Sequence, residues 1–384
     1  MLHLICESSG FGDLGPYGGP IDVPAIGQLA REGMRFTDFH TAPVCTPTRA
    51  MLLTGRYSQR MAHGALDWAL PHASRDGLPK PEVTLAEMLK GQYATRAIIG
   101  KWHLGGLPEF NPVNHGFTFF YGLLEADATY TTHTSGPYPD WWINLARNYA
   151  IEYTTFATTR EALRQMDTAG DHPFFIYVPY QAAHWPIALP GEDETHNKAV
   201  RPEVIKLVDK SIGAIMSRVR SLRRPTFVLF LADNGSAVDR ENLPLRGRKT
   251  SLYEGGIRVP AIAWWPGRVP HRISSAVLHV IDVLPTVAEL AGVPLLQRPL
   301  DGKSFARLFD GGKLPGRRLF WDFGGNAAMR EGPWKLVQIG KNAPELYNLS
   351  TDIGEQHNVA GANPRRVATL RAALDQWRKG VRSY

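Results

Sequence analysis

The sequence has little cysteine and no long apolar run. Only two of its 384 residues are cysteine, Cys6 and Cys45, which is too few for a disulfide framework. No apolar stretch approaches the roughly 20 residues that a bilayer-spanning helix needs, so we expect no membrane partner. The opening segment Met1–Cys6 is too short for a signal peptide and lacks its basic lead. We expect a cytoplasmic protein as written, or a periplasmic or secreted one if an upstream segment has been lost.

The chain also lacks a long basic tract. Lys and Arg outnumber Asp and Glu by 43 to 36, which gives a formal net charge of +7. The positive residues are spread along the chain, apart from short groups such as Arg223-Arg224 and Arg317-Arg318. Nucleic-acid-binding surfaces cluster basic residues and interleave them with aromatics, so we expect no nucleic-acid partner. The positive surplus favours anionic ligands.

Short apolar runs alternate with helical patterns through most of the chain. The runs lack the strict alternation of half-exposed strands and predict strands buried on both faces. They are Leu2–Cys6, Ala94–Ile99, Phe174–Val178 and Thr226–Ala232. The helical patterns are Pro24–Glu32, Thr84–Lys90 with a capping box, Pro202–Leu222 and Asp282–Ala291 with Asp282 as its cap. This alternation predicts an α/β fold with a mixed, largely parallel central sheet flanked by helices.

The pattern changes after about residue 297. Three short strand patterns with hairpin-like spacing are followed by one helical pattern; they are Leu319–Phe323, Trp334–Ile339, Glu345–Leu349 and Arg365–Arg378. We predict a smaller C-terminal α+β domain built on a short antiparallel sheet. The expected domains are residues 1–297 and 298–384.

Polar side chains follow each of the four predicted strands. In open α/β sheets, ligands bind outside the carboxyl ends of the strands. The residues at these ends include acids, an amide, two histidines and a lysine: Glu7, Ser8, Lys101, His103, His184, Asp233 and Asn234. Their convergence at one edge predicts an anion or metal site.

A glycine pattern follows the first strand. Residues 10–15 match G-x-G-x-x-G, which binds dinucleotides only where a helix follows. Pro16 and Pro20 argue against that helix. We expect the glycines to let the backbone turn tightly beside the site.

The segment Cys45-Thr46-Pro47-Thr48-Arg49 predicts the start of a helix. Pro47 suits the first helical position, and Thr46 would be the N-cap. Cys45 would then stand just outside a helix N-terminus, where free N–H groups favour an anion. Arg49, one turn into the helix, could point back toward Cys45. A capped helix with a surface arginine and a buried cysteine would give the same pattern.

The Cys-x-Pro-x-Arg pattern, with Leu-Thr-Gly-Arg at residues 53–56, resembles the signature of the type I, formylglycine-dependent sulfatase family, part of the alkaline phosphatase superfamily. Further family motifs are matched in the expected order along nearly the whole chain. They lie at residues 100–105, 183–186, 232–235, 246–249, 254–260, 284–286, 300–302 and 345–349. One such motif is weak evidence, but the ordered set is specific.

The resemblance implies a sulfuric ester hydrolase. In this family a maturase oxidises the cysteine, here Cys45, to formylglycine. One hydroxyl of the aldehyde hydrate attacks sulfur, and deprotonation of the other expels sulfate. The resemblance implies that Arg49 and Lys101 hold the hydrate and the sulfate oxygens, and that His103 is the base. His184 and Lys249 would assist the leaving group.

The resemblance also implies one divalent cation, generally calcium, held by oxygen ligands. The family usually places an Asp-Asp pair after the first strand and an Asp-Asn or Asp-His pair later. This chain has Glu7-Ser8 in the first place and Asp233-Asn234 in the second, and Cys45 would complete the set. The neutral serine removes one formal negative charge, and calcium affinity falls with ligand charge. We therefore question full occupancy of the metal site.

The substrate is expected to be a sulfated small molecule or carbohydrate. Two alternatives stay open. Related enzymes with the same fold hydrolyse phosphonate monoesters or phosphodiesters, and Glu7-Ser8 would also suit a non-catalytic binding protein on a degenerate sulfatase scaffold. The aromatic stretch Tyr130–Trp142 could stack on a sugar or aryl ring, or pack on the core.

Overall fold

A computed structural model describes residues 1–6, 9–61, 66–193, 198–295 and 298–381. Glu7 and Ser8, two of the expected metal ligands, lie outside the described residues. In the part of the chain that is described, no helix combines the length and apolar character needed to cross a bilayer.

The large domain is built on one sheet of eleven strands, in the order β12-β2-β11-β10-β1-β9-β3-β4-β7-β8, with β13 also paired to β2. The strands are β1 Leu2–Cys6, β2 Met34–His40, β3 Thr95–Ile99, β4 Phe119–Gly122, β7 Trp142–Ile143, β8 Ala146–Arg147, β9 Phe174–Tyr180, β10 Val228–Ala232, β11 Arg258–Trp264, β12 Arg272–Ser274 and β13 Leu278–His279. The five central strands, from β10 to β4, run parallel. Strands β11 and β7 run antiparallel to their neighbours. The predicted mixed, largely parallel sheet is confirmed.

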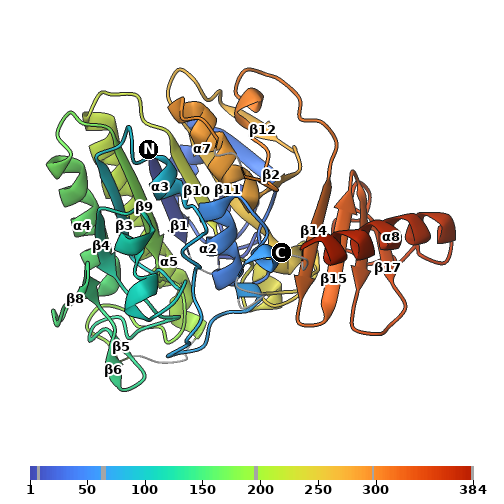
Figure 1. Ribbon diagram of the computed structural model, residues 1–384, viewed down its shortest axis with the longest axis horizontal. Coiled ribbons are helices and arrows are strands. Elements are labelled where there is room, and N and C mark those ends of the chain that lie inside the picture. Colours follow the sequence, from blue (N-terminus) through green and yellow to red (C-terminus); the bar gives the residue numbers. More distant parts are fainter. Residues whose placement is uncertain (7–8, 62–65, 194–197, 296–297, 382–384) are drawn as a thin grey trace.

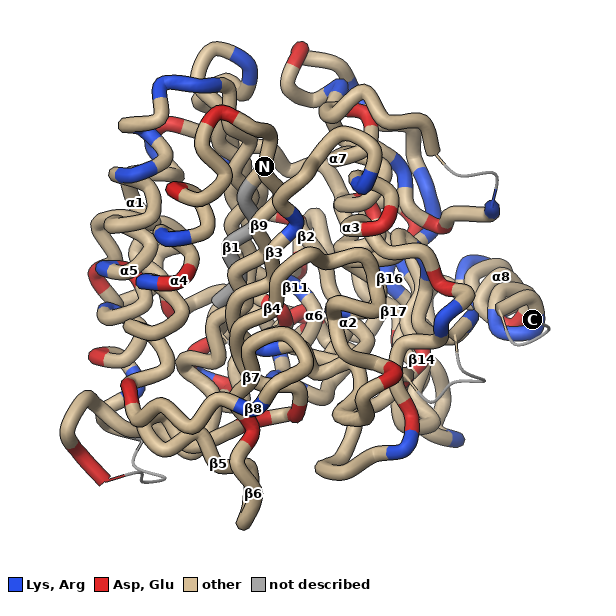
Figure 2. The backbone as a smooth tube through the Cα atoms, turned by 60° about the vertical axis from the view of Figure 1, so that its left-hand side comes forward, with Lys and Arg blue, Asp and Glu red and all other residues tan. Residues whose placement is uncertain are grey.

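Helices cover both faces of this sheet (Figure 2). One face carries α1 Pro24–Glu32, α4 Thr154–Thr168 and α5 Arg201–Ser221, and the other carries α2 Cys45–Thr54, α3 Leu85–Met88 and α7 Val283–Ala291. Each helical layer packs its apolar side chains on the sheet in a separate cluster. Because the sheet lies between two layers, its central strands are apolar on both faces, and all seven residues of β9 are buried.

Local end signals explain several helix boundaries. Thr84 and Glu87 form the predicted capping box at the start of α3. Asp282 is the N-cap residue of α7, as predicted, but its side chain accepts no hydrogen bond from that helix. That carboxylate instead accepts a hydrogen bond of 2.8 Å from the His279 backbone N–H, and so caps the short 3₁₀ turn Val280–Asp282 before α7.

The glycine pattern after β1 is not followed by a helix that could bind a dinucleotide. A single 3₁₀ turn, Gly15–Tyr17, comes next, and α1 begins at Pro24. Gly10 and Gly12 instead pass close to the loop at residues 241–243. A Cβ atom at either position would lie 2.2 Å from a backbone carbonyl oxygen of that loop, so only glycine permits this approach.

The small C-terminal domain lies at one end of the molecule (Figure 1). Its antiparallel sheet runs in the order β14 Arg318–Phe323, β15 Asn326–Glu331, β16 Trp334–Gln338 and β17 Glu345–Asn348. Helix α8, Pro364–Val381, packs on one face. The other face packs against apolar residues of the large domain, among them Val44 and Ile257. The predicted smaller α+β domain is confirmed; of its strands, β15 was not predicted.

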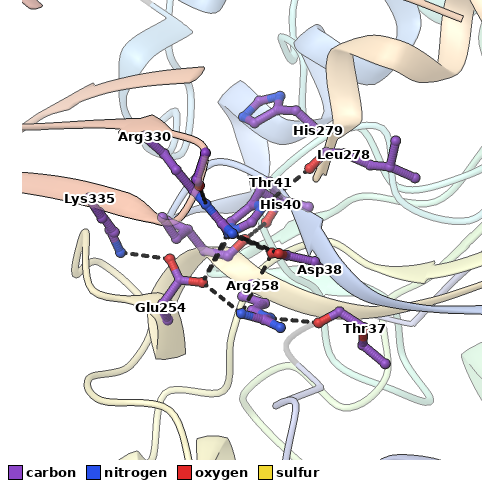
Figure 3. A network of polar contacts seen from close by, with 12 residues as sticks. Thr37, Asp38, His40, Thr41, Glu254, Arg258, Leu278, His279, Arg330 and Lys335 are labelled. Atoms are coloured by element: carbon purple, nitrogen blue, oxygen red, sulfur yellow. Dashed lines mark hydrogen bonds and ion pairs between the residues drawn. The ribbon is translucent and has the colours of Figure 1, made fainter. Parts of the chain in front are cut away.

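A buried set of ion pairs joins the two domains, and we call it the junction network (Figure 3). Arg330 of β15 donates to both carboxylate oxygens of Asp38 on β2, at 2.6 and 2.7 Å. Lys335 of β16 lies 2.8 Å from Glu254, at the start of the short helix α6 Glu254–Ile257. Burial alone would raise the pKa of Glu254, but Lys335 and His40 beside it hold that pKa well below its usual range. The buried charges of the network therefore depend on one another for neutralisation.

Candidate active site

The carboxyl ends of the central parallel strands bring the predicted residues to one edge of the sheet. Lys101 and His103 follow β3, His184 follows β9, and Asp233 follows β10. The Lys101 N–H donates to the carbonyl of Pro179 in β9 at 2.8 Å, so the ends of β3 and β9 adjoin. Strand β2, parallel to β10, leads at the same edge into α2, which begins with Cys45.

The start of α2 differs from the sequence prediction. The helix begins at Cys45 itself and Val44 is its N-cap, so the prediction that Thr46 caps the helix is wrong. The Thr46 hydroxyl instead donates to the His103 carbonyl at 3.2 Å and accepts a hydrogen bond from the Leu70 N–H at 3.1 Å. Thr46 therefore ties the first turn of α2 to two neighbouring loops, which fixes the position of Cys45.

Cys45 lies between a histidine and a lysine. Its Sγ atom is 3.1 Å from His103 Nδ1 and 4.0 Å from Lys101 Nζ. His103 Nε2 lies 3.0 Å from the Leu70 carbonyl oxygen, which can only accept, so Nε2 carries a proton. In the neutral imidazole, Nδ1 is then the acceptor that faces Sγ. The Cys45, Lys101 and His103 side chains are almost completely buried, so a base and a cation meet the cysteine away from bulk water.

Arg49 is fully buried and joins two of the strand-end loops. Its Nη1 donates to the Lys101 carbonyl at 2.7 Å, and its Nη2 lies 3.2 Å from Asp233 Oδ2. The ion pair with Asp233 offsets the cost of burying the guanidinium. These contacts bring Arg49 and Lys101 together, as the anion-site prediction requires.

The contacts described for His184 and Lys249 are made within the loop after β9 and with the loop after β10. His184 Nδ1 lies 2.8 Å from the Trp185 carbonyl oxygen, and its imidazole is mostly buried. The Lys249 N–H donates to the Ser236 carbonyl at 2.9 Å, and the residue is half-buried. Both residues therefore stay candidates for the site. Direct contacts connect a buried set of four predicted residues, which are Cys45, Arg49, Lys101 and His103.

Asp233 and Asn234 are the predicted metal ligands that the structure describes, apart from Cys45. Both are fully buried. The Asn234 amide nitrogen donates to the Gly235 carbonyl at 2.9 Å, so its amide oxygen points away from that carbonyl. A buried carboxylate beside an amide oxygen is the donor chemistry that calcium and other hard divalent cations prefer.

A second group of possible metal-ligand atoms lies in the junction network. Among the described residues, Asp38, His40 and Glu254 place one such atom each within 4.8 Å of the others. The two carboxylates are already paired with cations: Arg330 binds Asp38, and Lys335 and Arg258 lie 2.8 and 3.2 Å from Glu254. A metal ion would add charge to a place where these side chains already neutralise the acids. We interpret this group as an ion-pair network that holds the domains together.

Sequence reasoning missed three residues near the site. The Leu70 carbonyl fixes the His103 ring, and the segment that carries Leu70 and His72 has no motif that would reveal it. Asp127 follows β4, so the strand-end rule would have pointed to it if β4 had been predicted.

The aromatic stretch Tyr130–Trp142 divides between its two expected roles. Tyr130 and Trp141 are core residues, whereas Tyr138 is 69% exposed.

Comparisons with known proteins point to one family. The family model described as Sulfatase matches residues 1–293. Arylsulfatase A of Homo sapiens is 33% identical over 457 residues, which span 98% of this chain and 88% of that protein. N-acetylgalactosamine-6-sulfatase of Canis lupus familiaris is 33% identical over 397 residues, which span 94% of this chain and 76% of that protein.

Solved structures show the same fold. The crystal structure of Ps i-CgsB in complex with k-i-k-neocarrahexaose superposes with a TM-score of 0.89 at 28% identity, covering 98% of this chain and 92% of that one. A structure bound to D-glucosamine-2-N,6-O-disulfate superposes with a TM-score of 0.79 at 16% identity, covering 100% of this chain and 98% of that one. Because the family model covers most of the chain and the relatives nearly all of it, this chain belongs to the sulfatase family and is a sulfatase enzyme.

Proposed function

We propose that this sulfatase cleaves sulfate monoesters of carbohydrates with a nucleophile derived from Cys45 and with one bound divalent cation. The observation that carries the proposal is the buried contact of Cys45 Sγ with His103 Nδ1 at 3.1 Å, beside Lys101 Nζ at 4.0 Å. A cysteine held against a base and a cation at a helix N-terminus suits the attack on an anionic ester. The maturase that oxidises Cys45 is a required partner in this proposal.

The residues around Cys45 have separate roles in the proposed reaction. Formylglycine at position 45 would supply a hydrated aldehyde, with one hydroxyl to attack sulfur and a second to release sulfate. Lys101 would bind a sulfate oxygen, and Arg49 would hold the loops that carry Lys101 and Asp233 together. His103 Nδ1, an acceptor in the neutral imidazole, would take the proton whose removal releases sulfate.

Replacing His103 by alanine is expected to slow turnover of 4-nitrophenyl sulfate by at least about 100-fold, since general bases contribute this much. If His103 acts after the alcohol has left, the variant will release one equivalent of 4-nitrophenol in a burst and then almost stop. Rapid-mixing absorbance measurements test this. His357→Asn, at an imidazole that is 83% exposed, is the control and should behave as wild type. A His103→Ala variant with neither a burst nor a loss of rate would contradict the assigned role.

The cation would be held by Asp233 and Asn234, together with position 45 and, as the sequence motif implies, Glu7 and Ser8. Bound there, a divalent cation would offset the negative charge of the sulfate oxygens. Asp233 also holds Arg49, so it would keep the guanidinium and the cation side by side. Calcium is proposed because the donors are oxygens and because the family generally uses it.

Asp233→Asn is expected to weaken calcium binding by at least about tenfold, because the site loses a charged ligand. Calorimetric titration of chelator-treated protein with calcium measures this directly, without a substrate. Asp239→Asn removes an exposed acid of the nearby 3₁₀ turn Asp239–Asn242 and should bind calcium as wild type does. Equal affinities in Asp233→Asn and wild type would place the cation elsewhere.

The carbohydrate substrate class is proposed from the structural relatives and from the chain itself. Two solved neighbours carry neocarrahexaose and a glucosamine disulfate, and Tyr138 offers an exposed aromatic ring on the strand β6, Tyr138–Pro139. Desulfation of a panel of sulfated mono- and oligosaccharides would identify the sugar. Faster hydrolysis of aryl phosphonates than of every sulfate tested would favour the phosphonate alternative.

A further inference from the structure

Each carboxylate oxygen of Asp127 faces a different histidine. Its Oδ1 is 2.9 Å from His72 Nε2, and its Oδ2 is 4.0 Å from His184 Nδ1. The Asp127 side chain is 28% exposed, His184 is more buried, and His72 is about half exposed. The carboxylate therefore lies between a mostly buried imidazole, 4.0 Å away, and one that reaches the surface.

The cluster of Asp127, His72 and His184 lies next to the buried residues around Cys45. His72 comes two residues after Leu70, whose carbonyl accepts from His103 and whose N–H donates to Thr46. Two residues of extended chain span at most about 7 Å. His72 is thus held at the rim of the buried group, while His184 follows β9, the strand next to β3.

The segment that carries Asp127 is fixed to the loop that carries His184. The Tyr130 hydroxyl donates to the His184 carbonyl at 2.9 Å, and the Gln181 side chain donates to the carbonyl of Ala128. The Ser135 hydroxyl, farther along the same segment, lies 2.6 Å from His72 Nδ1. The three side chains of the cluster are therefore preorganised, because these hydrogen bonds fix the backbone at His184 and beside Asp127 and hold the ring of His72.

The hydrogen-bond partners define which imidazole nitrogens carry protons. His184 Nδ1 faces the Trp185 carbonyl oxygen at 2.8 Å, which can only accept, so this nitrogen carries a proton. Proton exchange with a substrate would then use His184 Nε2. The Asp127 carboxylate, 4.0 Å from Nδ1, attracts the ring most when both nitrogens are protonated.

We propose that Asp127 is a positioning residue that holds His184 as the proton donor to the departing alcohol and holds His72 at the mouth of the same subsite. The inference rests on the proposed function. As the oxygen at position 45 bonds to sulfur and the S–O bond to the alcohol breaks, the electron pair of that bond stays on the alcohol oxygen, which takes the Nε2 proton of the doubly protonated His184. His184 is left neutral, and the alcohol leaves past His72. The subsite takes alcohols too basic to leave without a proton, which include sugar hydroxyls.

The experiment compares kcat/KM of Asp127→Asn and wild type on 4-nitrophenyl sulfate and phenyl sulfate. The 4-nitrophenolate ion leaves readily and needs little proton donation, whereas phenolate is more basic. We expect a loss of about tenfold or more on phenyl sulfate and of less than about twofold on 4-nitrophenyl sulfate. Asp171→Asn, an exposed acid at the opposite edge of the sheet, is the control and should leave both rates unchanged.

Asp127→Glu tests the charge separately, since it keeps the carboxylate. It should retain most of the phenyl sulfate rate, and a loss as large as that of Asp127→Asn would overturn the proposal. An equal loss on both esters in Asp127→Asn, or no loss on either, would also overturn it. If matured wild-type enzyme hydrolysed neither these aryl sulfates nor any sulfated sugar, the proposed function would fail, and this inference with it.

Discussion

Cys45→Ala is expected to lower kcat on 4-nitrophenyl sulfate by about 10⁴-fold or more, since removing a nucleophile costs at least this much in well-studied hydrolases. The fold should survive, because the substitution removes one small side chain from a helix anchored along its whole length. Met51→Leu, a similar-volume change in the same buried helix, is the control for disturbance of α2 and should retain most of the activity.

Cys45→Ser separates the attack on sulfur from the release of sulfate. A serine hydroxyl could still attack sulfur, but it lacks the second hydroxyl that releases sulfate, so the enzyme should become trapped after one turnover. Intact-mass measurement should then show a protein heavier by one sulfo group. Peptide mass analysis of active wild-type enzyme should show the aldehyde in place of the thiol at position 45. Full activity from an enzyme whose Cys45 thiol is unmodified would refute the proposed nucleophile.

Arg330→Met is expected to lower the free energy of unfolding by about 3–5 kcal/mol, the usual cost of breaking a buried ion pair from one side. The change leaves the Asp38 carboxylate, 6% exposed as a residue, without its bidentate partner and weakens the neutralisation of Glu254. Calorimetry should show a melting temperature lower by several degrees.

Arg318→Met provides a matched comparison on the neighbouring strand β14. Its ion pair with Glu331 is exposed, at 45% and 44% for the two side chains, and exposed pairs contribute about 1 kcal/mol or less. If Arg330→Met and Arg318→Met melted at the same temperature, the junction network would not stabilise the protein in the way described.

The fold was predictable where the apolar pattern and the end signals agree. Pro24–Glu32 was predicted with its observed bounds, since a proline starts α1 and Gly33 follows it. The central strands were recognisable because both of their faces are covered. Strand β2 escaped prediction because polar and charged residues such as Arg35 and Asp38 interrupt its apolar pattern. Strand β11 escaped because it begins with Arg258 and has Pro260 inside its apolar run. Two of these charges, Asp38 and Arg258, are tolerated inside because the junction network pairs them, which only the tertiary structure reveals.

The candidate site was predictable from strand ends and motif order, which pointed to Lys101, His103, His184 and Asp233. The sequence could not supply the contacts that orient them. The carbonyl of Leu70 selects the His103 tautomer, and any residue type at position 70 would carry that carbonyl. Asp127 became visible only when β4 and β9 were placed on either side of β3.

The junction network ties the small domain to the segment that follows Lys249. Glu254 lies five residues after Lys249, and its carboxylate is held by Lys335, which belongs to a strand beyond the segment that matches the family model. A fragment ending at residue 293 would contain every residue proposed for catalysis, yet it would leave Glu254 without that lysine just beyond the Lys249 loop. We therefore expect the large domain to need the C-terminal sheet, because loss of that sheet would leave the buried carboxylates of Asp38 and Glu254 without Arg330 and Lys335 while sparing every residue proposed for catalysis.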